Sequence, residues 1–248
     1  MTAATLPTSG EPATIGRVIS PLLGTYKRAP MEFVRGAGFY LYDSEGKEYL
    51  DFTSGIGVNA LGHGDPGVMN AMSEAMKTGL VHVSNLFRTA PGERLAQALT
   101  ENSFADSVFF CNSGAEANEG AFKFVRKWAK KNFSAEKCEI VAVRGGFHGR
   151  LFASLAATDR PSYRAPFRPL AGAISISERN LDALRITLDG ETVAALIVEP
   201  VQGEGGIRVL DTEFLRGVRE LTLERDIVLI FDEIQCGLGR TGNLFAYQ

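Results

Sequence analysis

The order of apolar and polar residues divides the chain into stretches of different period. Between residues 31 and 53 the two types alternate in the runs EFVRGAGFYLYD and KEYLDF, with Ser-Glu-Gly between them. Alternation with a period of two is typical of strands with one buried face, and a short glycine-containing break joins such strands. The pattern therefore predicts a β-hairpin or meander in this region.

Helical signals begin at Asp65. This residue can cap a helix with Pro66 at its first position, and Gly79 can end that helix. The next helical pattern covers Pro91–Asn102. We therefore expect two helices between the hairpin and the rest of the chain.

From residue 107 on, strand-like apolar runs alternate with helical patterns. The strand-like runs are Ser107–Cys111, Glu139–Val143, Val193–Val198 and Ile227–Phe231. The helical patterns are Ala115–Phe133, Leu181–Leu188 and Glu213–Glu224, the last with Asp211 as its cap. This alternation predicts an α/β fold, with a mostly parallel, doubly wound sheet and helices on both faces. The uninterrupted apolar run at the fourth strand predicts burial on both sides.

These patterns predict three parts of the chain. Residues 1–16 are rich in alanine, threonine, proline and glycine, and we expect a loose N-terminal arm there. Residues 17–60 form an N-terminal segment with the hairpin, and residues 61–248 form part of a large ligand-binding domain. Because no closing helix pattern follows the fourth strand, we expect a domain that is incomplete at its C-terminus.

The overall composition restricts the partners and the compartment. The 248 residues are 45% hydrophobic and 22% charged, as in globular proteins with a sizeable core. A net charge of −3 gives no reason to expect nucleic-acid binding, and the sequence has no apolar run of membrane-spanning length. Three cysteines without a CxxC pair and three distant histidines predict neither disulfides nor a metal site. With no signal peptide in the first residues, we expect a cytoplasmic protein.

Candidate binding residues follow the ends of the predicted strands, where open parallel sheets bind ligands. After the first strand, Ser113, Gly114 and Ala115 open a helix, and free N–H groups at such a place bind phosphate. Ser113 and Glu116 can also form a capping box, which would leave the other N–H groups available.

The other three strands end in an aromatic loop and two carboxylates. In the loop RGGFHGR, Phe147 can stack on a flat ligand and Arg150 can bind a carboxylate. The alternative is a surface loop with Phe147 in the core, and we expect a structural role for His148. Glu199 and Asp232 end the third and fourth strands, although the proline and glycines after Glu199 can also serve only to end the strand.

Two phosphate-binding classes fit the sequence poorly. The strand LIFDE is typical of P-loop NTPases, but the single Gly-Lys pair, Gly46-Lys47, lies in the hairpin turn. Residues 55–60 match the dinucleotide-binding pattern only loosely, because glycines and a proline follow where a helix should begin. A ligand with a phosphate, a flat ring and a cationic ring atom fits better. Pyridoxal 5'-phosphate (PLP) has all three, and Asp232 would keep its ring nitrogen protonated.

Four ordered motifs carry a family resemblance. NSGAEANE, GGFHGR, VEPVQGEGG and FDEIQCGLGRTG resemble the class III (subgroup II) aminotransferases, which are PLP-dependent enzymes of fold type I. HVSNLF and LDFTSGIGVNALGHGDP extend the resemblance, which covers the chain from about Arg17. Within the family, the likeness is greatest to members that act on N-acetylornithine.

The resemblance implies roles for the candidate residues. Gly114 and Ala115 would hold the cofactor phosphate, Phe147 would stack on the ring, Asp232 would pair with the ring nitrogen, and Gln235 would reach the ring hydroxyl. Arg150 would bind the substrate α-carboxylate. Glu199 would act as a gate by pairing with, or releasing, an arginine that this chain does not contain.

The same resemblance implies an activity and an assembly. The expected reaction moves an amino group from N-acetylornithine to 2-oxoglutarate in a ping-pong cycle, as part of arginine biosynthesis. Ornithine, succinylornithine and 4-aminobutyrate remain open as alternative donors. A homodimer with its active site at the subunit boundary is also implied.

The family's Schiff-base lysine has no counterpart here. That lysine follows the Asp232 strand in the family, whereas the last lysine of this chain is Lys137. Lys123 lies eight residues beyond Ala115, roughly 12 Å along the helix and away from the phosphate end. A second hypothesis is therefore that this chain by itself is a non-catalytic PLP-binding fragment.

Overall fold

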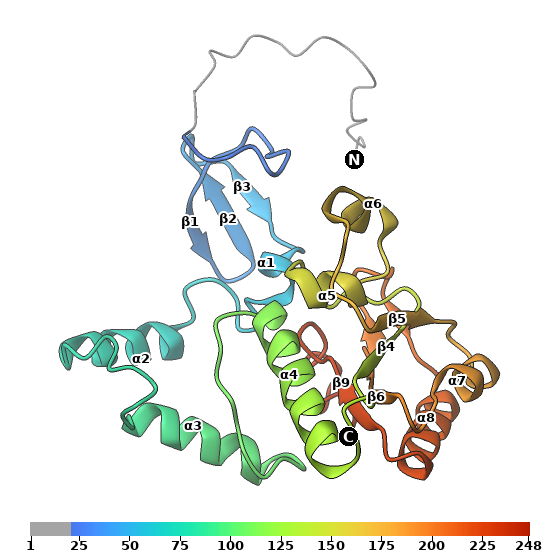
Figure 1. Cartoon of the computed structure of the whole chain (residues 1–248). Helices are drawn as coiled ribbons and strands as arrows, with labels where there is room; N and C mark the ends of the chain where they lie inside the picture. The colour runs from blue at the N-terminus through green and yellow to red at the C-terminus, as the bar shows by residue number, and fades with distance from the viewer. Residues whose placement is uncertain (1–20) are drawn as a thin grey trace, which may run out of the picture.

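The computed structural model describes residues 21–248. The arm expected at residues 1–16 lies outside this range. Within it, a small antiparallel sheet, two projecting helices and a larger α/β unit follow one another along the chain (Figure 1).

The N-terminal sheet has three antiparallel strands in chain order: β1 (Phe33–Ala37), β2 (Tyr40–Asp43) and β3 (Glu48–Leu50). The predicted hairpin or meander is confirmed, but its first run contains two strands. Gly38 turns the chain between them with a φ of +57°, which glycine adopts without strain. Asp43 stabilises the second turn by accepting hydrogen bonds from the amides of Glu45 and Lys47.

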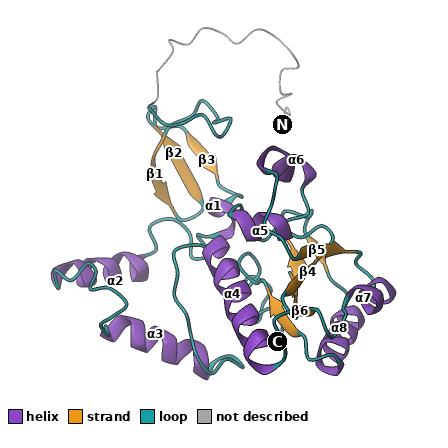
Figure 2. Ribbon diagram, in the orientation of Figure 1, coloured by secondary structure: helices purple, strands orange, loops and turns teal. Residues whose placement is uncertain are grey.

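Three helices connect this sheet to the larger unit: α1 (Ser54–Gly57), α2 (Pro66–Lys77) and α3 (Ala90–Glu101). As predicted, Asp65 caps α2, because its Oδ1 accepts a hydrogen bond from the amide of Val68 at 2.9 Å. No side chain of α2 or α3 is buried. Both helices project to one side of the larger unit (Figure 2).

The central sheet is parallel and has the order β5-β4-β6-β9. Its strands are β4 (Glu139–Val143), β5 (Ile174–Ser177), β6 (Val193–Val198) and β9 (Val228–Phe231). A short hairpin, β7 (Val201–Gln202) and β8 (Arg208–Val209), follows β6. The connecting helices are α4 (Gly114–Asn132), α5 (Phe152–Ala157), α6 (Pro161–Arg164), the 3-10 helix η1 (Ala165–Phe167), α7 (Leu181–Thr187) and α8 (Thr212–Glu224).

Helices cover both faces of this sheet and produce two apolar cores. Val141 and Val143 of β4 pack with residues of α7 and α8 on one face. Ile140 and Ala142, which alternate with them, pack with residues of α4 and α5 on the other. The predicted doubly wound α/β fold is therefore confirmed.

The strand predictions need three corrections. Ser107–Cys111 is not a strand, because no neighbour pairs with it in the described part of the chain, and Phe109 and Phe110 are exposed. The sequence patterns missed β5, whose four residues are too short for a clear signal. Finally, β9 is half-buried rather than buried on both sides, because it lies at the edge of the sheet.

None of the helices in residues 21–248 combines the length and the apolar character needed to cross a bilayer.

Candidate active site

The direction of strand addition reverses next to β4. The chain runs from β4 outward to β5, returns to β6 on the other side of β4, and continues to β9. In open parallel sheets, ligands bind beyond the carboxyl ends of the strands at such a reversal. A cavity of about 280 Å³ lies there. The residues that line it are Gly114, Ala115, Asn118, Phe147, His148, Gly149, Arg150, Glu199, Asp232, Ile234 and Gln235.

The N-terminus of α4 forms one wall of this cavity. Ser113 caps the helix, because its Oγ accepts a hydrogen bond from the amide of Glu116 at 3.2 Å. The Glu116 carboxylate reaches back to the amide of Asn112 at 2.6 Å, one residue before the position that a standard capping box uses. The amides of Gly114 and Ala115 have no acceptor among residues 21–248. They are available to bind an anion, and Ser113 itself does not line the cavity.

Asp232 is a buried carboxylate on another wall, only 6% exposed. Its Oδ2 accepts a hydrogen bond from Nδ2 of Asn118 and lies near Nδ1 of His148, both at 2.8 Å. Its Oδ1 accepts a hydrogen bond from the amide of Ile234 at 3.2 Å. Both oxygens are thus held, which fixes the orientation of the carboxylate toward the cavity.

Phe147 and Glu199 lie together on the same cavity. The amide of Phe147 donates a hydrogen bond to Oε2 of Glu199 at 2.8 Å, and the Phe147 side chain is half-buried rather than enclosed in the core. Burial raises the pKa of Glu199 to about 7, although the bond from Phe147 opposes this rise. Glu199 therefore fixes the loop after β4, and its role as a gate stays a prediction.

Arg150 lies at the exposed rim of the cavity among three aromatic rings. Its guanidinium carbon is 4.7 Å from the ring centre of Tyr163, 5.6 Å from that of Tyr26 and 5.8 Å from that of Phe147. Its Nη1 also donates a hydrogen bond to the Tyr26 hydroxyl at 3.2 Å. These contacts orient the guanidinium while leaving donors free for a carboxylate.

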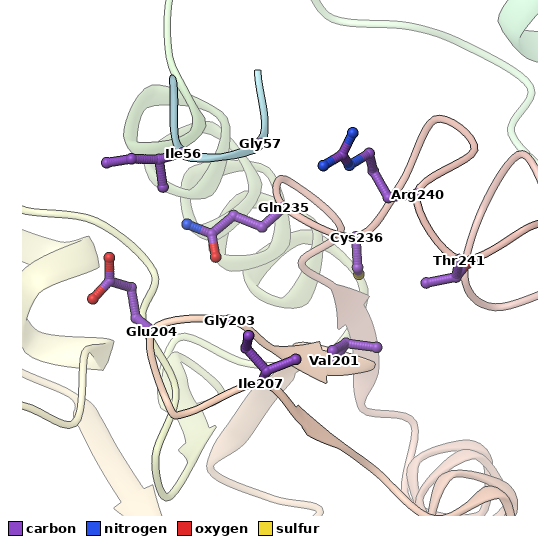
Figure 3. A pocket seen from close by; sticks show the side chains of 10 residues that line it. All are labelled: Ile56, Gly57, Val201, Gly203, Glu204, Ile207, Gln235, Cys236, Arg240 and Thr241. Carbon is purple, nitrogen blue, oxygen red and sulfur yellow. The ribbon is translucent and has the colours of Figure 1, made fainter. Parts of the chain in front are cut away.

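Gln235 connects this cavity to a second one of about 520 Å³, because it lines both. Figure 3 shows Gln235, Glu204 and Arg240 on different sides of the second cavity, which also borders Ile56 and Gly57. The second cavity therefore extends the space available next to Gln235, with one acidic and one basic side chain on its walls.

Sequence reasoning missed four residues of this site. His148, for which the sequence predicted only a structural role, lies against Asp232 in the site. Asn118 could have been found, since it lies one helical turn after the Gly114 and Ala115 amides and so on their face. No local signal identifies Tyr26 or Tyr163, which reach Arg150 only through the tertiary fold.

No lysine lines either cavity in the described part of the chain. Lys137 is buried elsewhere, where its ammonium group contacts the carbonyl oxygens of Gly190 and Arg225. Lys123 is exposed on α4. Neither of these lysines lies beside the carboxylate of Asp232.

Known proteins resemble this chain in sequence and in fold. The family model described as aminotransferase class-III matches residues 24–248. The acetylornithine aminotransferase of Methanocaldococcus jannaschii is 48% identical over 227 residues, which are 91% of this chain and 56% of the relative. The succinylornithine transaminase of Yersinia enterocolitica is 47% identical over 232 residues, again 91% of this chain and 56% of the relative.

A solved structure is also similar. The ornithine aminotransferase of Toxoplasma gondii superposes with a TM-score of 0.86 at 30% identity, over 92% of this chain and 54% of that one. In that structure, PLP occupies the active site in part. This chain spans about half the length of the curated relatives that it matches.

The raised pKa of Glu199 predicts a pH-dependent stability. The folded chain binds this proton more tightly than the unfolded chain, whose carboxyl titrates near 4.5, so stability falls as the pH rises from 4.5 to about 7. The full decrease is at most about 3 kcal/mol. Glu199→Gln, which resembles the protonated form, should remove this decrease and be more stable than the wild type at pH 8. Urea unfolding at pH 5 and pH 8 measures the effect.

The exposed carboxylate of Glu191 provides a matched control. Glu191→Gln should leave the difference between the two pH values unchanged. An equal pH dependence in wild type and Glu199→Gln would contradict the assignment.

Proposed function

The chain belongs to the class-III aminotransferase family, and on this basis we propose that the protein containing it moves an amino group from N-acetylornithine to 2-oxoglutarate with PLP as cofactor. The observation that carries the proposal is the single cavity that Asp232 shares with the free amides of Gly114 and Ala115. A place in arginine biosynthesis follows from this reaction.

The residues around the cavity fit PLP. Two unpaired amides at the N-terminus of a long helix suit its dianionic phosphate. A buried carboxylate with both oxygens oriented suits its ring nitrogen, and the half-buried ring of Phe147 can cover the face of a flat heterocycle. The walls are also close together, because a Cβ on Gly114 would lie 2.9 Å from the side chain of Ile234.

Each residue of the site then has a physical task. When bound, PLP supplies a ring that withdraws electron density from the Cα of an amino acid. The negative charge of Asp232 favours a proton on the facing ring nitrogen, which makes that withdrawal stronger. The Gly114 and Ala115 amides would fix the phosphate end, and Gln235, which lines the same cavity, would bind the ring hydroxyl. Arg150 offers two parallel donors to a substrate carboxylate.

Donor specificity is proposed from relatives rather than from the site. The matched relatives are named for acetylornithine, succinylornithine and ornithine, which share a five-carbon diamino acid skeleton. The second cavity next to Gln235 provides room for the acylated end of such a substrate.

The second candidate function is a PLP-binding fragment without catalytic activity. The specific observation in its favour is that neither cavity of the described chain contains a lysine to bond covalently to the cofactor. In this case the 248-residue chain would bind PLP reversibly, and turnover would need the remaining half found in its relatives.

We predict that the 248-residue chain binds PLP and that Asp232→Asn weakens binding by about tenfold or more, because a neutral amide no longer favours the protonated ring nitrogen. Equilibrium dialysis measures the affinity, and Asp182→Asn is the control because Asp182 is exposed on α7.

Borohydride reduction of the chain with PLP should label no specific lysine. A single labelled lysine together with turnover would refute the fragment hypothesis. In the dialysis experiment, equal PLP affinity in Asp232→Asn and Asp182→Asn would refute the placement of Asp232.

The amino donor is tested on the protein extended to the length of its relatives. Turnover with 2-oxoglutarate should be highest for N-acetylornithine among a panel that includes N-succinylornithine, ornithine and 4-aminobutyrate. A coupled glutamate assay measures each rate. Activity on 4-aminobutyrate without activity on N-acetylornithine would remove the proposed donor.

We further propose that the protein is a homodimer. Met69, Met72 and Met76 lie on one face of α2 and are all more than half exposed, and neither α2 nor α3 has a buried side chain. Contiguous apolar surface of this kind is typical of an interface. The active site would lie at the subunit boundary.

Met72→Glu should shift the protein from dimer to monomer, because it places a charge in the apolar face of α2. Multi-angle light scattering measures the mass. Asn70→Glu adds the same charge on a different side of the helix and should leave a dimer. A monomeric wild type would contradict the proposal.

A further inference from the structure

Asn118 connects two parts of the site that are distant in the sequence. We propose that it is a positioning residue, which ties the carboxylate of Asp232 to helix α4 so that a single rigid element sets both ends of the cofactor site. The inference rests on the proposed function, since it assigns a role in binding the PLP ring.

Both hydrogens of the Asn118 amide are used. Its Nδ2 donates one hydrogen bond to Oδ2 of Asp232 and another to the carbonyl oxygen of His148, each at 2.8 Å. Both partners are acceptors, so the opposite orientation of the amide would place its oxygen against two oxygens. Asn118 is only 5% exposed, so water does not replace these partners and its amide has one favourable orientation.

Helix α4 fixes the position of the Asn118 side chain relative to the free amides at its N-terminus. Asn118 lies four residues after Gly114, so about 6 Å of helix separate the free amides from the side chain that holds Asp232. The helix is 19 residues long, and its buried residues Phe122, Val125 and Ala129 pack against the central sheet. The spacing between the phosphate end and the ring-nitrogen end is therefore set by the backbone of one helix and by one hydrogen bond.

The second neighbour of Asp232 depends on the same asparagine. His148 contacts Oδ2 of Asp232 from the loop after β4, and Asn118 binds the carbonyl oxygen of that same histidine. Loss of Asn118 would free Oδ2 of Asp232 from one of its two side-chain partners and remove the hydrogen bond that holds the carbonyl group of the other. The amide of Asn118 carries no titratable proton, so it donates at every pH.

A purely structural role for Asn118 makes a different prediction. A residue that only fills buried polar positions would affect every ligand of the cavity equally. A residue that acts through Asp232 affects only ligands with a ring nitrogen for that carboxylate to face. The two roles are therefore separated by an analogue of PLP in which a CH group replaces the ring nitrogen.

The test measures binding of PLP and of this carbon analogue to the 248-residue chain by calorimetry. Asn118→Ala should weaken PLP binding about tenfold and analogue binding less than twofold. In an Asp232→Ala background, Asn118→Ala should change PLP binding less than twofold, because its partner is absent. Asn132→Ala is the matched control, since it removes a hydrogen-bonded asparagine at the far end of α4.

Circular dichroism and urea unfolding show whether each variant is folded. If Asn118→Ala does not fold, Asn118→Asp replaces it, because this side chain has the same shape and places a second carboxylate beside Asp232. It should weaken PLP binding by more than tenfold and analogue binding less.

Equal losses for PLP and the analogue, or an undiminished loss in the Asp232→Ala background, would overturn the positioning role and leave the proposed function intact. A wild-type chain without affinity for PLP would overturn both.

Discussion

A carboxylate removed from water is the constraint on which the rest of the site depends. Burial of an ionised group is unfavourable unless hydrogen bonds replace its hydration. Asp232 meets this requirement with Asn118, His148 and the amide of Ile234, which come from three separate segments. The need to satisfy one carboxylate thus brings α4, the loop after β4 and the end of β9 together. The cavity between them is a consequence of that convergence.

Close backbone contacts hold the other side of the site. The loops after β4 and β6 approach so tightly that a Cβ on Gly205 would lie 2.6 Å from the carbonyl oxygen of Gly145. Between them, the buried amide of Gln202 donates to the carbonyl oxygen of Arg144 and accepts from Arg179. Glycine is needed here because a side chain would prevent the close approach of the two loops. These loops position Phe147 and Glu199 on the cavity. The loops after β4 and β6 are therefore held together as one assembly beside the cavity.

The two cavities of the described residues bring groups of different charge together. In the described residues, the cavities are lined by two unpaired helix amides, a buried carboxylate and an exposed arginine, but by no lysine. The unpacked apolar faces of α2 and α3 and the half-buried edge strand β9 are further surfaces without partners in residues 21–248. Under the proposed function, these surfaces would contact other parts of the assembly.

The sequence alone determined the features that depend on local pattern. Asp65 and Asp211 predicted helix caps, and the runs at β4, β6 and β9 predicted strands of a parallel sheet, because capping and side-chain periodicity are properties of neighbouring residues. The ends of these strands correctly pointed to Phe147, Glu199 and Asp232 as neighbours in space. The four motifs also identified the family, which the comparisons confirm.

Only the tertiary structure decided which residues meet. An apolar run such as Ser107–Cys111 needs a hydrogen-bonded neighbour to become a strand, and the run itself cannot supply one. The pairing of Asn118 and His148 with Asp232 spans 114 and 84 positions, and Tyr26 reaches Arg150 across 124. Contacts between distant residues depend on how the elements pack, and packing is a property of the whole fold rather than of any single stretch of sequence.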